Sequence, residues 1–179
     1  MAAPAHAPGK KITLNKEALE RIDAASGALG FVSREAALTS AIELLEILAW
    51  AQRGGKKIGI GKIEGASFML VEKTIKLPKG PSAANYFNNA AGAGNQIMLS
   101  NKNLVKLDAA SGVLKLVSRD TALAFALDLL DTLAQAKNNG KEMGIGKIDG
   151  LDYMRAIETV GTDKKNPGHL GVVVNKPRF

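Results

Sequence analysis

Residues 12–53 read ITLNKEALERIDAASGALGFVSREAALTSAIELLEILAWAQR, and the same pattern returns 85 positions further along the chain. The whole repeat spans residues 12–75 and 97–160 without an insertion or deletion, and 30 of its 64 positions are identical. Solenoid folds need about three or more stacked units to bury their faces, so two copies indicate duplication of one small unit. We expect each unit to cover the core of the other.

The composition is that of a globular protein. Of the 179 residues, 46% are hydrophobic but only 4% are aromatic, so aliphatic side chains must build the core. The absence of cysteine excludes disulfides and thiolate metal sites, and it fits a reducing compartment such as the cytoplasm. No apolar run approaches the roughly 20 residues that span a bilayer, so we expect no membrane partner. Residues 1–9 do not resemble a secretory signal and are interpreted as a flexible arm.

The formal net charge of +7 is distributed unevenly along the chain. Residues 10–79 hold 12 basic against 8 acidic side chains, residues 95–160 hold 8 of each, and residues 161–179 hold 4 against 1. A basic excess favours polyanionic partners such as nucleic acid. Because the first repeat and the tail carry this excess, we expect an asymmetric basic surface.

Each repeat begins with a short alternation of polar and apolar side chains, in residues 10–15 and again in residues 96–100. Such alternation is typical of a strand with one buried face. The expected inward residues are Ile12, Leu14, Ile97 and Leu99. A strand this short needs a neighbour, and the obvious neighbour is the strand of the other copy. Asn15 and Ser100 then stand where each following helix needs an N-cap.

Two helices are predicted after each strand. Leu19, Ile22, Ala25 and Leu29 recur at helical spacing, and the first helix should end by Gly30. Ser33 and its copy Ser118 stand at the start of a second helix, which should run to about Arg53 in the first copy and about Lys137 in the second. This second helix is apolar on more than one side, so it must be buried from two directions.

Strand, helix, capped turn and long helix, all in duplicate, resemble the ribbon-helix-helix family of DNA-binding proteins, which includes the Arc and MetJ repressors. The resemblance covers residues 10–53 and 95–138. It implies an α+β fold in which tandem ribbon-helix-helix repeats form a single-chain pseudo-dimer with short β extensions. It also implies that the paired strands enter the major groove of double-stranded DNA and that the N-terminus of each second helix meets a phosphate.

The resemblance assigns roles to particular side chains. The residues that would contact base edges are Lys11, Thr13, Asn15, Gln96, Met98 and Ser100. Met98 departs from the pattern, since a thioether reaches only a thymine methyl or packs elsewhere. The residues that would contact phosphates are Ser33, Arg34, Ser118 and Arg119, with Lys62 and Lys147 as additional candidates. The alternatives are a solvated ribbon face and plain helix capping.

Beyond the second helix the family comparison ends. Residues 55–65 and their copy are rich in glycine and lysine but lack the spacing of a phosphate-binding loop. We interpret them as an extended turn or edge strand, with Ile60 and Ile145 buried. Residues 68–75 have the composition of a strand, whereas that of residues 151–159 also allows a helix. The units are therefore residues 10–77 and 96–160, joined by a linker at 78–95. The tail at 161–179 is either an edge strand or a mobile arm.

The predicted function is DNA binding, as a transcriptional repressor or as an accessory factor on plasmid or phage DNA near the nucleoid. The alternative is a structural module of the same fold that binds a protein partner. Both a pseudo-dimeric monomer and a homodimer remain open. No cofactor, metal or catalytic role is expected, because His6 and His169 lie outside the repeats. Asp23 and Asp108 are interpreted as solvated or capping residues.

Overall fold

The computed structural model describes residues 9–64, 68–78, 96–150, 153–162 and 170–174. In chain order the elements are β1 (Lys10–Thr13), α1 (Lys16–Leu29), α2 (Arg34–Arg53), β2 (Lys57–Glu64), β3 (Phe68–Thr74), β4 (Gln96–Leu99), α3 (Asn101–Leu114), α4 (Arg119–Asn138), β5 (Glu142–Asp149), β6 (Tyr153–Thr162) and β7 (Leu170–Val174). This mixture confirms the α+β class. The predicted arm and linker lie, apart from Gly9 and Pro78, outside the described residues.

The helices begin and end where their capping residues predict. Asn15 Oδ1 accepts the Ala18 N–H at 2.8 Å, which fixes the start of α1. Gly30, with φ of 79°, ends the same helix in the left-handed conformation that glycine adopts without strain. Ser33 Oγ accepts the Ala36 N–H at 3.1 Å at the start of α2. Local sequence therefore places both helices of the first unit.

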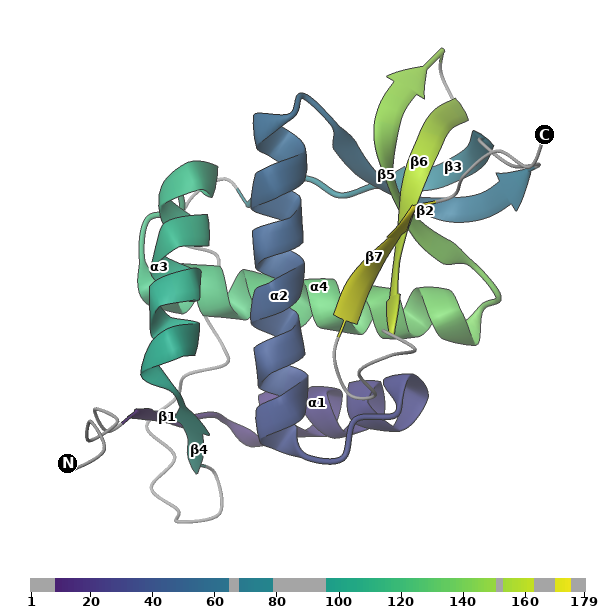
Figure 1. The fold of residues 1–179 in the computed structure, drawn as a ribbon. Coiled ribbons are helices and arrows are strands. Elements are labelled where there is room, and N and C mark those ends of the chain that lie inside the picture. Colours follow the sequence, from purple (N-terminus) through teal and green to yellow (C-terminus); the bar gives the residue numbers. More distant parts are fainter. Residues whose placement is uncertain (1–8, 65–67, 79–95, 151–152, 163–169, 175–179) are drawn as a thin grey trace, which may run out of the picture.

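β1 and β4 pair as a two-stranded antiparallel ribbon, as predicted. Ile12 lies opposite Ile97, so the ribbon is centred on equivalent positions of the two repeats. Ile97 and Leu99 are buried, and Ile12 packs against the same core. The ribbon lies at one end of the molecule, and the larger sheet lies at the other (Figure 1).

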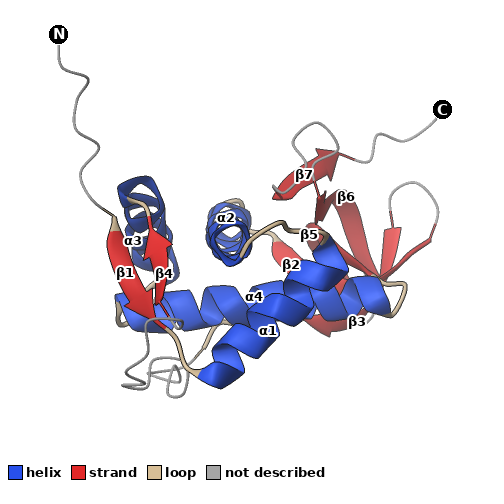
Figure 2. Ribbon diagram, turned by 90° about the horizontal axis from the view of Figure 1, so that it is seen from below, coloured by secondary structure: helices blue, strands red, loops and turns tan. Residues whose placement is uncertain are grey.

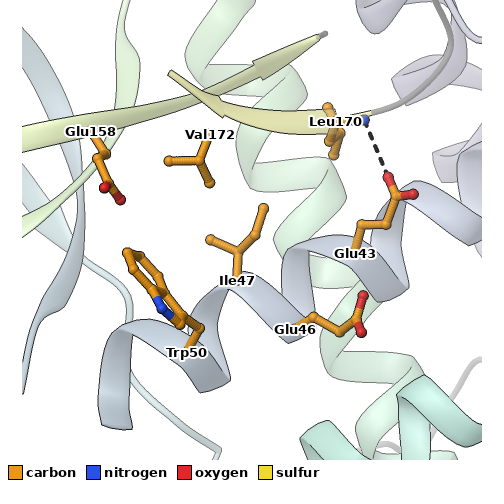
Figure 3. Close-up of a pocket in the computed structure, with 7 residues that line it drawn as sticks. All are labelled: Glu43, Glu46, Ile47, Trp50, Glu158, Leu170 and Val172. Carbon is orange, nitrogen blue, oxygen red and sulfur yellow. Dashed lines mark hydrogen bonds between the residues drawn. The ribbon is translucent and has the colours of Figure 1, made fainter. Parts of the chain in front are cut away.

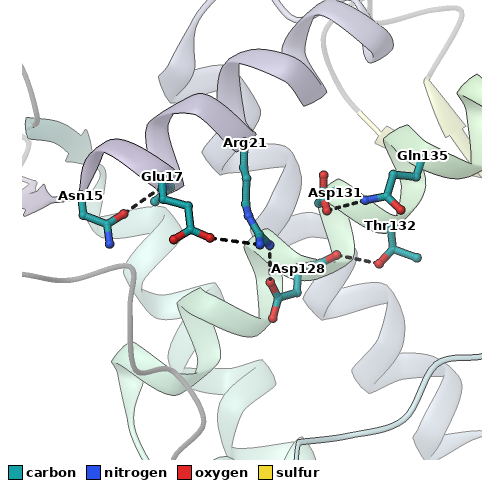
Figure 4. Close-up of polar contacts among 8 residues, drawn as sticks. Asn15, Glu17, Arg21, Asp128, Asp131, Thr132 and Gln135 are labelled. Atoms are coloured by element: carbon teal, nitrogen blue, oxygen red, sulfur yellow. Dashed lines mark hydrogen bonds and ion pairs between the residues drawn. The ribbon is translucent and has the colours of Figure 1, made fainter.

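The helices of the two units are crossed. α1 packs mainly on α4 of the other unit, α3 packs mainly on α2, and α2 also contacts α4. Polar contacts follow the same pattern: Asn103 Nδ2 donates to Thr39 Oγ1 at 2.9 Å, and Arg21 lies 3.6 Å from Asp128 (Figure 4). The second helices are therefore buried from two directions, and each unit covers the core of the other.

The segments after the second helices form a closed barrel of four strands. The order is β3-β2-β5-β6, and β3 pairs with β6 to close it, while β7 adds to the far edge of β6. The expectation of an extended turn or an edge strand is wrong, because β2 and β5 are each hydrogen-bonded on both sides. The helix allowed for residues 151–159 is also wrong, because the described part of this stretch, from Tyr153 onward, belongs to β6. Strand pairing between distant segments overrides its helical composition.

Closure of so narrow a barrel explains the repeated Gly-Ile-Gly. A Cβ on Gly61 would lie 1.8 Å from the Leu70 carbonyl oxygen, and one on Gly146 would lie 2.0 Å from that of Arg155. Both glycines sit at irregularities in the strand register, where the backbones approach most closely. The isoleucine between each pair is buried, as predicted for Ile60 and Ile145. The glycines are therefore required by the barrel.

A local twofold relation organises the whole molecule. Besides the pair at the centre of the ribbon, Gly59 lies opposite Gly144 and Met69 lies opposite Met154, and both pairs are equivalent positions of the repeat. Figure 2 shows the ribbon and the barrel at opposite ends of the helical layer. Among the described residues, every helix is too short or too polar to cross a bilayer.

Candidate nucleic-acid interface

The ribbon presents four of the predicted base-contact residues on one face. In the antiparallel register Lys11 lies opposite Met98, and Thr13 lies opposite Gln96. Side chains of directly opposite residues share a face, and these four alternate with the inward Ile12 and Ile97. Lys11, Gln96 and Met98 are exposed, with 46% of Met98 accessible, and Thr13 is half-buried. The face therefore combines one cation, hydrogen-bonding groups and one apolar side chain.

The other two predicted base-contact residues, Asn15 and Ser100, lie beyond the strand ends. β1 ends at Thr13 and β4 at Leu99. The Asn15 side chain caps α1, and Ser100 Oγ accepts the Asn103 N–H at 3.2 Å at the start of α3. Their side-chain oxygens are used by the helices, so the readable face is the set of four.

The N-termini of α2 and α4 are the places where phosphate contacts are predicted. Ser33 and Ser118 cap them by accepting an N–H three residues ahead, from Ala36 and Thr121, each at 3.1 Å. This bond uses the third N–H of the helix, and the first two N–H groups have no partner inside a helix. Such groups, with the helix dipole, attract anions. Acidic residues in both first turns, Glu35 and Asp120, oppose an additional anion there.

The two arginines that follow the caps are paired within the chain. Arg34 donates through Nε and Nη2 to Asp23 at 2.8 and 2.7 Å, and Arg119 does the same to Asp108 at 2.8 and 2.6 Å. These hydrogen bonds lower the pKa of both carboxyls below the ordinary aspartate value. Asp23 and Asp108 are solvated, as interpreted, with about half of each side chain exposed, but each is also paired with an arginine, which was not predicted. The sequence contained the signal, because the eleven-residue spacing recurs in both copies.

A shallow groove joins the ribbon to the start of α4. It measures about 140 Å³, and its polar lining includes Lys10, Lys11, Thr13, Arg119 and Asp120. Two predicted groups, a base-contact strand and a phosphate-contact helix start, therefore lie side by side. Lys10 was not among the predicted contact residues, although it is exposed and begins β1. The position of Lys10 next to Lys11 in the sequence could have indicated it as a contact residue.

The other two predicted phosphate-contact residues, Lys62 and Lys147, lie elsewhere. They are exposed on β2 and β5 of the barrel, at the end of the molecule opposite the ribbon (Figures 1 and 2). The fold does not bring them together with Lys11 or Arg119. One DNA duplex seated on the ribbon would not reach them.

Comparison of the chain with protein-family models, with curated proteins and with solved structures finds no match. Among the described residues, no three histidine, aspartate or glutamate side chains gather as they would around a metal ion. The ribbon and the neighbouring helix starts are therefore the basis for assigning a function.

Proposed function

We propose that this protein is a tandem ribbon-helix-helix protein that binds double-stranded DNA and acts as a repressor or accessory factor by occupying a site. The observation that carries the proposal is the ribbon face of Lys11, Thr13, Gln96 and Met98, formed by equivalent strands of the two repeats. A two-stranded ribbon fits the major groove of B-form DNA. In this proposal the single chain supplies both halves of what two subunits supply in dimeric relatives of the family.

The contacts divide into two kinds. Lys11 suits guanine, Gln96 suits adenine, Thr13 suits either, and Met98 suits a thymine methyl. Lys10 and the first N–H groups of α2 and α4 suit phosphates, which fix register and carry no sequence information. The side chains of Arg34 and Arg119 remain 40% and 42% exposed beside their aspartates, so each adds a partly neutralised cation.

The site bound in this way is not palindromic. Equivalent positions of the ribbon hold different residues, lysine and threonine on one strand against glutamine and methionine on the other. Residues 10–79, which include the first repeat, also carry a basic excess, whereas residues 95–160, which include the second, are neutral. Each half of the ribbon is therefore expected to prefer a different half-site, which identical subunits do not achieve.

The test is fluorescence anisotropy of labelled random-sequence duplex DNA titrated with the full chain at 50 and 200 mM salt. We expect binding that weakens steeply with salt, because displaced counterions accompany every neutralised phosphate. A preferred sequence is then selected from a random library. Absence of binding at the lower salt concentration overturns the proposal.

Substitution separates ribbon contacts from general basicity. The triple change Lys11→Ala, Thr13→Ala and Gln96→Ala should abolish preference for the selected sequence and weaken binding to it at least about tenfold, since each base contact contributes about 1–3 kcal/mol. The matched control is Lys62→Ala with Lys147→Ala on the barrel, which removes more charge from the opposite end. Equal losses in both variants contradict ribbon readout.

Protein binding by the same fold is the second candidate, favoured by one observation. Val32 is 92% exposed and its equivalent Val117 is 64% exposed, each directly before an N-cap serine. A pair of equivalent exposed apolar side chains next to the starts of α2 and α4 suits a protein surface better than a duplex. If DNA binding fails at low salt, loss of a captured protein partner in Val32→Ser with Val117→Ser supports this candidate.

A further inference from the structure

A pocket of about 560 Å³ lies between α2 and the strands β6 and β7 (Figure 3). Its size is within the range of small-molecule sites in proteins. It combines three carboxylates, an indole ring and three aliphatic side chains: Glu43, Glu46, Glu158, Trp50, Ile47, Leu170 and Val172. The pocket is separate from the ribbon, and nothing in the proposed function uses it.

One carboxylate oxygen of the pocket lacks a hydrogen-bond donor among the described residues. Glu43 Oε2 accepts the Leu170 N–H at 3.2 Å, and Glu46 lies 3.4 Å from Lys106. Glu158 Oε2, in contrast, is buried and has no hydrogen-bond partner in the described part of the chain. A buried carboxylate oxygen without a donor is costly, and a charged donor compensates it best.

The remaining lining suits an organic cation. Glu158 points toward the Trp50 ring, and Ile47 and Val172 lie between Glu158 and the Glu43 side of the pocket (Figure 3). Trp50 is 48% exposed, and its ring already attracts a cation, since Lys56 Nζ lies 4.9 Å from the ring centre. An indole face attracts ammonium and guanidinium groups, and aliphatic walls accommodate the carbon chain that carries them.

The local twofold supplies an internal comparison. The corresponding pocket on α4 measures about 580 Å³, and its lining includes Lys73, Asp128 and Thr132 at the positions of Glu158, Glu43 and Ile47. Lys76 also lines it. The cation of that pocket is therefore a lysine of the chain itself, at the position where the first pocket has the unpartnered Glu158. The two pockets are similar in size, but their linings differ in charge at this position.

We propose that the pocket beside Trp50 binds an alkylammonium or guanidinium group on an aliphatic stem. The cationic group lies between the Glu158 carboxylate and the Trp50 ring, and the stem lies against Ile47, Leu170 and Val172. A free aliphatic amine and the lysine or arginine side chain of a peptide offer the same chemistry. The equivalent pocket with Lys73 does not bind such a group.

The chain reports on this pocket directly, because Trp50 is its single tryptophan. Intrinsic fluorescence of the full chain is measured during titration with 1,4-diaminobutane, with blocked lysine amide and with blocked arginine amide. Butan-1-ol and sodium chloride at matched ionic strength are the controls. We expect a saturable change for the cations and none for the controls. Tighter binding of the blocked amino acids than of the diamine identifies a peptide as the source, and the reverse identifies a free amine.

Calorimetric titration then measures affinity independently of the fluorophore. Glu158→Gln keeps the side-chain shape and should weaken binding about tenfold or more, as expected for losing a hydrogen bond to a charged group. Lys73→Gln, at the equivalent position of the other pocket, should leave the affinity unchanged. Unchanged affinity in a folded Glu158→Gln variant overturns the proposal, as does equal binding of butan-1-ol. Neither outcome depends on whether the ribbon binds DNA.

Discussion

Asp23 with Arg34, and Asp108 with Arg119, tie the first helix of each unit to the start of the second. Both partners of each pair are about half exposed, so each pair contributes only about 0.5 kcal/mol to stability. Their positions are more important than that energy. Each aspartate holds its arginine beside an N-terminus where a phosphate is expected to bind, and it also reduces the local positive charge.

The pairs predict how stability depends on pH. Hydrogen bonds from arginine lower the pKa of Asp23 and Asp108 in the folded chain. The stabilisation is therefore complete above the unfolded pKa of about 3.9 and is lost as pH falls through the lower folded value. Asp23→Asn with Asp108→Asn should cost about 1 kcal/mol at pH 7 and less near pH 2, by urea unfolding. The same cost at both pH values contradicts this account.

Among the elements, β2 and β5 each depend on one glycine for their close approach to the neighbouring strand. Gly61 and Gly146 let a neighbouring carbonyl oxygen occupy the space of a side chain. These positions make the barrel narrow enough for Met69 and Met154 to fill, together with Ile63 and Val71. The second glycine of each Gly-Ile-Gly thus allows the barrel to close.

Gly61→Ala or Gly146→Ala should destabilise the protein by about 2 kcal/mol or more, because the added methyl group meets backbone and not a flexible side chain. The matched control is Gly27→Ala in α1, where a Cβ meets nothing within 4 Å. There, alanine should be neutral or stabilising by up to about 1 kcal/mol. Urea midpoints of the three variants test this, and equal effects at Gly61 and Gly27 would contradict the role given to the barrel glycines.

The local elements were predictable because their signals are local. Asn15, Ser33 and Gly30 mark helix ends through bonds that span a few residues, and the repeat itself indicated that the two strands pair. The barrel was not predicted, since no local signal in residues 68–75 or 151–159 indicates that β3 pairs with β6 and closes the sheet. The equivalence of Met69 and Met154 in the repeat was a usable signal that residues 153–159 form a strand, as residues 68–74 do. The pocket beside Trp50 depends on β7, which has no counterpart in the repeat pattern.

Over the whole molecule, neither unit has a core of its own. α1 rests on α4, α3 rests on α2, and each sheet contains strands from both units. The two units therefore share one core, and their sequences differ at the ribbon and at the pockets on α2 and α4.

Residues 9–78 expressed alone should not fold as a monomer, because the surfaces that α4 and β5 cover would face water. We expect either an unfolded chain or a concentration-dependent homodimer that pairs Ile12 with Ile12. Circular dichroism and analytical ultracentrifugation across a hundredfold range of concentration distinguish these states. A folded monomer at the lowest concentration contradicts the crossed packing, and the full chain, whose halves are covalently joined, is the control.

Closure of the barrel also affects how long the two units stay together. β2 and β5 are hydrogen-bonded on both sides, so exchange of one unit with a neighbouring molecule would first require opening the barrel, the crossed helices and the ribbon. Partly opened states that expose strand edges are those from which proteins swap segments and aggregate. We therefore expect that, once the barrel has closed within one chain, exchange of a unit between molecules is as slow as global unfolding.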